Sequence, residues 1–293
     1  MADINFSNSN FVTPKNKLQS GLYIVSTPIG NLKDITFRAL ETLSNADFVL
    51  CEDTRVTERL ISHYGIKAKL FTYNDHNAEK MRDKAFRWLE QGKSVALVSD
   101  AGTPLISDPG YKLAKEARQK AFNVTAIPGA SAAIMGLTVS GLPTDEFHFC
   151  GFIKSKDSAR ENELEKLKHI NTTLVFYERA DRCEPFLESC LSVFGDKPAA
   201  LTRELTKLFE EVITGSTSEV IKRISGKELK GEVVLLIHNA KDEGAGMDDA
   251  KKILREHMKT LSLKEAVDLT VEQTGGKKKQ IYNLALEIKD EEA

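Results

Sequence analysis

The first half of the chain alternates between short apolar runs and segments with helical periodicity. The apolar runs have the length of buried strands and lie at residues 22–26, 46–51, 69–73, 94–99 and 123–127. In the segments between them apolar residues recur every three or four positions, as at Ala85, Trp88 and Leu89. Strands that alternate with helices pair in parallel, so this pattern predicts an α/β layered domain.

The second half carries strand-like runs with a different spacing. These runs lie at residues 147–152, 172–177, 199–203, 209–215 and 232–238. A hairpin is expected across Glu204 to Leu208, and helices are expected near 160–169, 181–194 and 216–226. The pattern predicts a mixed sheet with helices packed on it. A Gly/Pro turn cluster near residues 140–147 separates the two halves.

A polar stretch at residues 239–246 precedes a third unit. There, Ser262 and Glu265 have the spacing of a capping box, which begins a helix, and a second helix follows the "TGG" that starts at Thr274. We therefore predict four parts. They are a flexible segment at 1–20, α/β domains at 21–141 and 142–240, and a small helical unit at 247–293.

Composition narrows the possible classes of protein. The chain has 293 residues, of which 41% are apolar and 29% charged, and its net charge of −2 argues against coating nucleic acid by bulk electrostatics. Its apolar runs are too short to span a membrane, and its polar amino terminus does not resemble a signal peptide. The four cysteines lack metal-ligand spacing, so we expect no metal site and reduced thiols in a cytoplasmic protein.

Candidate chemistry lies in four loops that follow predicted strands of the first half. These loops are Thr27–Asp34, Cys51–Arg55, Ser99–Gly110 and Pro128–Ala133. The first has one glycine, so it is neither a dinucleotide fingerprint nor a P-loop. Because ligands bind at the carboxyl ends of strands in an α/β sheet, the four loops together predict one shared pocket.

Two of these loops have residues suited to a ligand. Asp100 is followed by small residues, so its carboxylate and the nearby backbone amides can face one crevice, whereas Asp108 and Pro109 are expected to begin the next helix. Gly129 permits a close backbone approach, and Ser131 can cap a helix. The alternative for each loop is an ordinary turn without a ligand.

Seven motifs occur along the chain in this order: "YIVSTPIGNLKDIT", "CEDTR", "SDAGTPLISDPG", "IPGASAA", "SGLPTDEF", "TRELTKLFEE" and "KGEVV". Taken together, they resemble one known family, the ribosomal small-subunit methyltransferase I family of the tetrapyrrole-methylase superfamily. The resemblance implies two α/β domains with S-adenosylmethionine in the cleft between them, in a homodimer. It also implies 2′-O-methylation of a cytidine of 16S rRNA at the decoding centre of the small ribosomal subunit.

The resemblance also implies the residues of the donor pocket. They are Pro28, Asp100, Ala101, Gly102, Thr103, Ser131, Ala132, Phe152 and the "FYE" segment that contains Tyr177. At positions 179–181 this chain has Arg-Ala-Asp where family members commonly have Ser-Pro-His, so the resemblance assigns no role to those three positions.

A ribose hydroxyl becomes a good nucleophile when it loses its proton, which a carboxylate or a neutral lysine can accept. The candidates for this catalytic role, which the sequence does not rank, are Glu52, Asp53, Glu178 and Lys207. Arg55 and Arg203 are expected either to bind RNA phosphate or to hold those carboxylates. Lys277 and Lys278 are either RNA contacts or solvated charges at a helix start.

Two other functions stay open on the sequence. A small-molecule methyltransferase acting on porphyrinoids has the same fold, but it leaves the "EDTR" motif and the basic carboxyl-terminal helices unexplained. A non-catalytic RNA-binding or ribosome-assembly factor that keeps a donor pocket is the third possibility.

Overall fold

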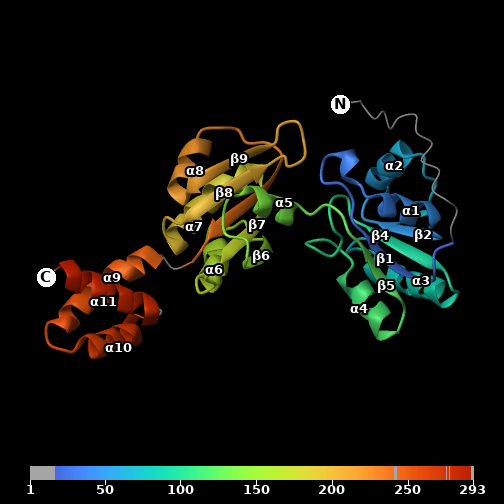
Figure 1. Ribbon diagram of the computed structural model, residues 1–293. Coiled ribbons are helices and arrows are strands. Elements are labelled where there is room, and N and C mark those ends of the chain that lie inside the picture. Colours follow the sequence, from blue (N-terminus) through green and yellow to red (C-terminus); the bar gives the residue numbers. More distant parts are fainter. Residues whose placement is uncertain (1–16, 241–242, 275, 277, 292–293) are drawn as a thin grey trace, which may run out of the picture. The chain divides into compact units, whose positions relative to one another are not determined.

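The computed structural model describes residues 17–240, 243–274, 276 and 278–291 (Figure 1). Its first sheet contains five strands, paired in parallel in the order β3-β2-β4-β1-β5. The strands are β1 (Gly21–Val25), β2 (Phe48–Cys51), β3 (Leu70–Thr72), β4 (Ser94–Val98) and β5 (Val124–Ile127). The parallel α/β layer predicted for the first half is confirmed.

Helices cover both faces of this sheet. On one face lie α1 (Phe37–Asn45) and α2 (Thr54–His63), and on the other lie α3 (Ala78–Glu90) and α4 (Tyr111–Gln119) (Figure 1). Successive strand residues point to opposite faces, so Val49 packs in the cluster of α1 and α2 while Leu50 packs with Trp88 of α3. Both faces are buried, which explains why these strands read as nearly continuous apolar runs.

The order of the strands creates a crevice at one end of the sheet. β1 and β4 are neighbours, but β1 continues through α1 on one face and β4 continues through α4 on the other. Their connecting loops therefore diverge at the carboxyl end of the sheet, which is where open α/β sheets bind ligands.

The second sheet is mixed, with the order β6-β7-β10-β8-β9. Its strands are β6 (Phe147–Phe152), β7 (Thr173–Arg179), β8 (Pro198–Arg203), β9 (Glu211–Ser216) and β10 (Glu232–His238). β6 and β7 are parallel, and the other pairs are antiparallel, including the predicted hairpin of β8 and β9. Because β10 runs against β7 and β8, its first residue, Glu232, lies opposite Arg179 at the end of β7.

Helices also cover both faces of the second sheet. One face carries α6 (Asp157–Leu167), α7 (Cys183–Phe194) and α8 (Thr217–Ile224) over a large apolar core. The other face carries α5 (Ala132–Val139), whose Ala133 and Leu137 pack against Val234. α5 directly follows β5, so the loop before it joins the end of the first sheet to the second sheet. Two short 3₁₀ helices, η2 (Leu32–Asp34) and η3 (Ala180–Arg182), follow β1 and β7.

Residues 239–293 form a separate compact unit. It contains α9 (Glu243–Met258), α10 (Leu263–Thr274) and α11 (Lys278–Glu291), which share a small apolar core. The predicted capping box is confirmed, because the Glu265 amide donates to Ser262 Oγ and the Ser262 amide donates to Glu265 Oε2. α9 begins at Glu243, inside the stretch expected to be a linker.

Three other expectations concern the whole chain. Residues 1–16 of the predicted flexible segment lie outside the described residues, and the domain boundaries stay predictions. All four cysteines are free, and burial raises the pKa of the Cys51 thiol to about 11. Among the described residues, no helix is both long and apolar enough to cross a membrane.

Candidate functional site

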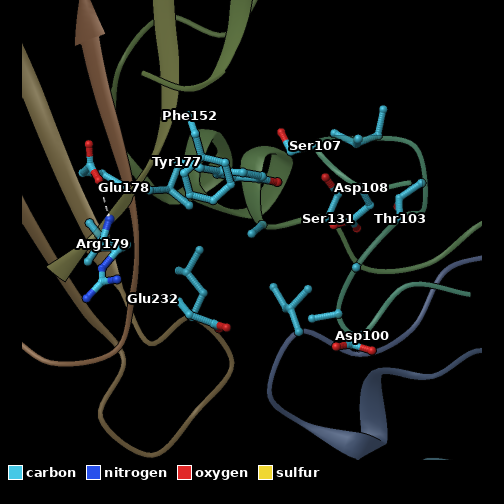
Figure 2. Close-up of a pocket in the computed structure, with 18 of the residues that line it drawn as sticks. Asp100, Thr103, Ser107, Asp108, Ser131, Phe152, Tyr177, Glu178, Arg179 and Glu232 are labelled. Atoms are coloured by element: carbon cyan, nitrogen blue, oxygen red, sulfur yellow. Dashed lines mark hydrogen bonds between the residues drawn. The ribbon is translucent and has the colours of Figure 1, made fainter. Parts of the chain in front are cut away.

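A cavity of about 410 Å³ lies where the loops at the carboxyl end of the first sheet meet strand ends of the second (Figure 2). Its volume is within the range of small-molecule sites. The residues predicted for the donor pocket that line it are Asp100, Ala101, Gly102, Thr103, Ser131, Ala132, Phe152 and Tyr177. Glu52 and Glu178, two of the catalytic candidates, line it as well.

Hydrogen bonds join the loops that follow β1, β4 and β5. The amides of Thr27 and Gly102 each donate to the carbonyl of the other residue, at 2.9 and 3.1 Å. Thr103 Oγ1 donates to the Ala130 carbonyl at 3.1 Å. A Cβ on Gly129 would lie 2.7 Å from Ser26 Cβ, so this position requires glycine. These contacts make one side of the cavity a fixed backbone frame.

Three carboxylates give this side of the cavity a negative character. Burial raises the pKa of Glu52, and the neighbouring charge of Asp100 raises it further. Burial also raises the pKa values of Asp100 and Asp108. The Asp53 amide donates to Asp100 Oδ1 at 3.1 Å, which fixes the Asp100 side chain at the start of the loop after β4. Mutual repulsion of this kind is relieved by a bound cation.

The structure corrects the interpretation of Asp108 as a helix-start residue. The N-cap of α4 is Gly110, at φ 131°, and no side chain caps that helix. Leu105 and Ser107 have positive φ angles of 76° and 65°, so the loop turns back before the helix starts. As a result, Ile106, Ser107 and Asp108 line the cavity, in addition to the four residues after Ser99 that the sequence assigned to it.

The second sheet contributes large side chains from strand ends. Phe152 ends β6, and its ring lies 5.5 Å from that of Tyr177 in an edge-to-face arrangement. The Ala133 amide, at the start of α5, donates to Tyr177 Oη at 3.2 Å. Ser131 is the N-cap residue of α5 but makes no capping hydrogen bond, so the expectation that its side chain caps the helix is wrong. Tyr177 of β7 instead accepts the hydrogen bond from the amide of Ala133 in the first turn of the helix.

Several lining residues were missed by the sequence reasoning. The start of β10 contributes Gly231, Glu232, Val233 and Val234, and the loop after β8 contributes Leu205. The loops singled out in the sequence follow the carboxyl ends of strands, whereas antiparallel β10 brings its amino end to the cavity. The "KGEVV" motif was the available signal, since it contains these positions.

A second cavity, of about 310 Å³, adjoins the first and contains Pro28 and Lys207. Lys207 Nζ lies 2.9 Å from Glu204 Oε1 and 3.0 Å from Glu232 Oε2. Burial acts to lower the pKa of Lys207, but the two carboxylates outweigh it and the net pKa is raised. A lysine can act as a base only when its amine is neutral. The raised pKa therefore disfavours the base role considered for Lys207.

Three of the four residues predicted to bind RNA are held in ion pairs. Arg55 Nη2 contacts Asp53 Oδ2 at 2.6 Å, and hydrogen bonds from Arg55 lower the pKa of Asp53 to about 2. Arg203 Nε lies 2.5 Å from Glu211 Oε2. Lys278 pairs with Asp268 at 2.5 Å, whereas Lys277 lies outside the described residues. RNA binding by Arg55, Arg203, Lys277 and Lys278 stays a prediction.

The unusual residues at positions 179–181 divide between two environments. Arg179 pairs with Asp181 at 3.0 Å, and both side chains are more than half exposed. Ala180 is buried in the core of the second sheet. Arg179 also lines the larger of the two cavities, so this position is both a surface charge and a candidate ligand contact (Figure 2).

The lining of the larger cavity suits an organic ligand. Within the described part of the chain, no group of three His, Cys, Asp or Glu side chains is placed to hold a metal ion. The lining combines backbone amides, carboxylates and an aromatic pair. Such a lining suits a ligand that has both a cationic group and an aromatic ring.

Family models match most of the chain. The model described as tetrapyrrole (corrin/porphyrin) methylases matches residues 21–221. The model described as the RsmI C-terminal HTH domain matches residues 244–289.

Curated relatives match this chain over nearly their whole length. A protein of Mesorhizobium japonicum named "Ribosomal RNA small subunit methyltransferase I" is 42% identical over 279 residues, which are 94% of this chain and 95% of the relative. One of the same name from Escherichia coli O157:H7 is 42% identical over 274 residues, 92% of this chain and 96% of the relative. A solved structure of uroporphyrin-III C-methyltransferase from Thermus thermophilus, complexed with S-adenosyl homocysteine, aligns with a TM-score of 0.53 at 18% identity, covering 75% of this chain and 98% of that one.

Proposed function

The chain belongs to the ribosomal RNA small subunit methyltransferase I family of tetrapyrrole methylases, and on that premise we propose that it methylates the ribose 2′-oxygen of a cytidine in 16S rRNA. The donor is S-adenosylmethionine, and the target nucleotide lies at the decoding centre of the small ribosomal subunit. Methylation of small-subunit rRNA follows from the family itself. The cytidine, the 2′-oxygen and the decoding centre are the finer parts of the proposal.

The observation that carries the proposal is the pair of adjoining cavities at the ends of the two sheets. S-adenosylmethionine supplies a methyl group on a positively charged sulfur. The carboxylates of Glu52, Asp100 and Asp108 favour a cation in the larger cavity. The rings of Phe152 and Tyr177 offer apolar surface to the adenine.

The second cavity suits an acceptor that approaches from outside. It shares Ile29, Asp100, Ala101 and Glu232 with the first cavity, so a group bound in one can reach a group bound in the other. Methyl transfer requires the acceptor oxygen about 3–3.5 Å from the methyl carbon, and the protein's main task is to hold that geometry. A nucleotide unstacked from single-stranded rRNA can enter such a recess.

The direct test uses small ribosomal subunits from a strain that lacks the gene. We expect the purified protein and S-adenosylmethionine to produce 2′-O-methylcytidine in 16S rRNA, measured by mass spectrometry of its nucleosides. A methyl group on a base, or none at all, would contradict the proposal. Parallel incubation with labelled donor and a tetrapyrrole separates the porphyrinoid alternative, because only that alternative predicts transfer to the pigment.

The helical unit at residues 239–293 is proposed to bind the rRNA, in keeping with its helix-turn-helix family model. We expect a chain that ends at Ala240 to methylate small subunits at least about tenfold more slowly at limiting substrate, because one of two linked binding units is lost. Its calorimetric affinity for S-adenosylmethionine should stay within about twofold of the full chain. Equal losses in the methylation rate and in the affinity for S-adenosylmethionine would show that this unit is structural.

The proposal also includes a cytoplasmic homodimer. α5 has an apolar face buried against the second sheet, yet Ile134, Met135 and Val139 on the same helix are exposed. Exposed apolar residues on one short helix are suited to a subunit interface. Sedimentation velocity of the full chain measures the oligomeric state, and a monomer at micromolar concentration would contradict this part of the proposal.

A further inference from the structure

The two cavities meet at a carboxylate that the sequence reasoning left out. Glu232, the first residue of β10, lines both cavities, and so does Asp100 (Figure 2). Any proton acceptor for the 2′-hydroxyl must be within hydrogen-bond reach of the acceptor and close to the donor's methyl group. A carboxylate that lines both cavities lies where the two bound groups would meet, so it is suited to that requirement.

The side chain of Glu232 is held by two less exposed neighbours. Lys207 Nζ contacts Glu232 Oε2 at 3.0 Å and Glu204 Oε1 at 2.9 Å. Glu204 Oε1 also accepts from the Glu232 amide at 3.2 Å, so Glu204 fixes both the lysine and the strand start. The side chain of Glu232 is 74% exposed, compared with 28% for Lys207 and 20% for Glu204. A substrate can therefore reach Glu232, while its supports are covered.

Two glycines make room for these supports. A Cβ at Gly30 would lie 2.6 Å from Lys207 Cγ and Cε, and a Cβ at Gly231 would collide with the Glu204 carboxylate. Both glycines have positive φ angles, 154° at Gly30 and 94° at Gly231. Glu204 itself has a φ of 51°, an unfavourable conformation for a residue with a side chain. The arrangement is thus built into the backbone of both sheets' loops.

The carboxylates of Glu178, Asp53, Asp108 and Glu52 each line at most one of the two cavities, as far as the linings are described. Glu178 is buried and accepts from the Arg179 amide at 2.8 Å. Asp53 accepts several hydrogen bonds from Arg55. Asp108 and Glu52 line the larger cavity and not the second one, as far as the residues of the two cavities are described.

Asp100 shares both cavities but belongs to the loop frame that is proposed to hold the donor. Its Oδ1 accepts from the Asp53 amide, so that oxygen is held toward the loop after β2. Figure 2 shows Asp100 and Glu232 on opposite sides of the cavity. The two shared carboxylates are therefore suited to different partners.

We propose that Glu232 accepts the proton of the 2′-hydroxyl and that Lys207, supported by Glu204, is the positioning residue that orients the Glu232 carboxylate. This inference rests on the proposed function. In the step, the bond between the 2′-oxygen and the methyl carbon forms, and the bond between that carbon and the donor's sulfur breaks. The hydroxyl proton passes to a Glu232 carboxylate oxygen, which later releases it to water, and S-adenosylhomocysteine leaves neutral at sulfur.

The test measures single-turnover methylation of unmodified small subunits at saturating donor and saturating enzyme. We expect Glu232→Gln to lower the rate by about 10²- to 10⁴-fold, because a general base contributes on that order. Its calorimetric dissociation constant for S-adenosylmethionine should stay within about threefold of wild type, which also shows that the variant is folded. The matched control is Glu228→Gln, since Glu228 is an exposed carboxylate paired with Lys230 in the loop before β10. This control should keep the wild-type rate.

Lys207 is tested by rescue. Lys207→Met should reduce the single-turnover rate with little change in subunit affinity, and Lys207→Arg should recover part of that loss because it restores a cation beside Glu232. A purely structural lysine would instead lower subunit affinity or folding in both variants. Glu232→Gln at the wild-type rate, or a large loss in Glu52→Gln instead, would overturn the inference. A wild-type protein that methylates no subunit rRNA would overturn the proposed function itself.

Discussion

The two sides of the donor cavity are made in different ways. The first sheet contributes loop backbone, small side chains and the carboxylates of Glu52, Asp100 and Asp108, and its loops are joined by hydrogen bonds such as those between Thr27 and Gly102. The second sheet contributes large side chains at strand ends, including Phe152 and Tyr177, and one hydrogen bond from the Ala133 amide to Tyr177 Oη joins them to α5. The first side should therefore be damaged by added volume and by loss of charge, whereas the second side should tolerate loss of a hydroxyl as long as its rings stay.

Gly129→Ala is the strongest test of the first side. The new Cβ would lie 2.7 Å from Ser26 Cβ, so the loops after β1 and β5 must separate. Because misplacement by about 1 Å can cost 10²-fold, we expect donor affinity to fall by about 10- to 100-fold in calorimetry. We also expect overpacking to lower the free energy of unfolding by about 1–3 kcal/mol.

Gly65→Ala is the matched control for that variant. Gly65 has a φ of 67° and open space around its Cβ position, in the turn after α2. Alanine there is strained by about 1–2 kcal/mol without touching the cavity, so stability falls and donor affinity does not. Equal donor affinity in the two variants would show that the loop frame tolerates volume, and the comparison between the two sides would fail.

Asp100→Asn removes charge from the first side while keeping its shape. The amide oxygen can still accept from the Asp53 amide, which donates to Asp100 Oδ1 at 3.1 Å. Hydrogen bonds to charged groups contribute about 1.5–3 kcal/mol, so we expect donor affinity to fall by at least about tenfold in calorimetry. Asp145→Asn, at an exposed position outside the site, should leave it unchanged.

The same charge gives the wild-type protein a defined pH dependence. Burial raises the pKa of Asp100, and the pKa values of Glu52 and Asp108 at the same cavity are raised as well. A raised pKa means that these carboxylates lose their charge at a higher pH than ordinary ones, so donor affinity should be full at neutral pH and weaken as the pH falls. Asp100→Asn should show a shallower loss, because Glu52 and Asp108 still titrate. A donor affinity independent of pH down to about 4 would contradict this.

The two sides also differ in how well the sequence predicts them. The carboxyl ends of parallel strands meet at one edge, so listing the loops after each strand found Asp100, Thr103 and Ser131 correctly as neighbours. Asp108 was misplaced because an Asp-Pro pair before a helix has the same local pattern whether or not the preceding residues turn back. That turn depends on positive φ angles at Leu105 and Ser107, which no preference of those residue types predicts.

Glu232 was missed for a different reason. Its position at the site follows from the antiparallel pairing of β10 with β7 and β8, which are more than 25 residues earlier in the chain. Hydrophobic periodicity identifies a strand but carries no information about its direction or its partners. The lining residues of β10 therefore required the structure, whereas the strands of the second sheet and its hairpin were predicted from the sequence.

Tyr177→Phe is the mildest test of the second side. The ring stays, with its edge-to-face contacts to Phe149 at 5.0 Å and to Phe152 at 5.5 Å, so the apolar surface offered to the donor is kept. The Ala133 amide loses its acceptor, and Ser131 makes no capping hydrogen bond that could replace it. One such bond contributes about 0.5–1.5 kcal/mol, so we expect a comparable loss in the free energy of unfolding and donor affinity about threefold weaker.

Denaturant unfolding and calorimetry measure the two effects, with Tyr111→Phe as the control, because Tyr111 is 64% exposed at the start of α4. If Tyr177→Phe weakened donor binding as much as Asp100→Asn, the hydroxyl would contact the donor directly, and the second side would hold it by polar groups as the first side does.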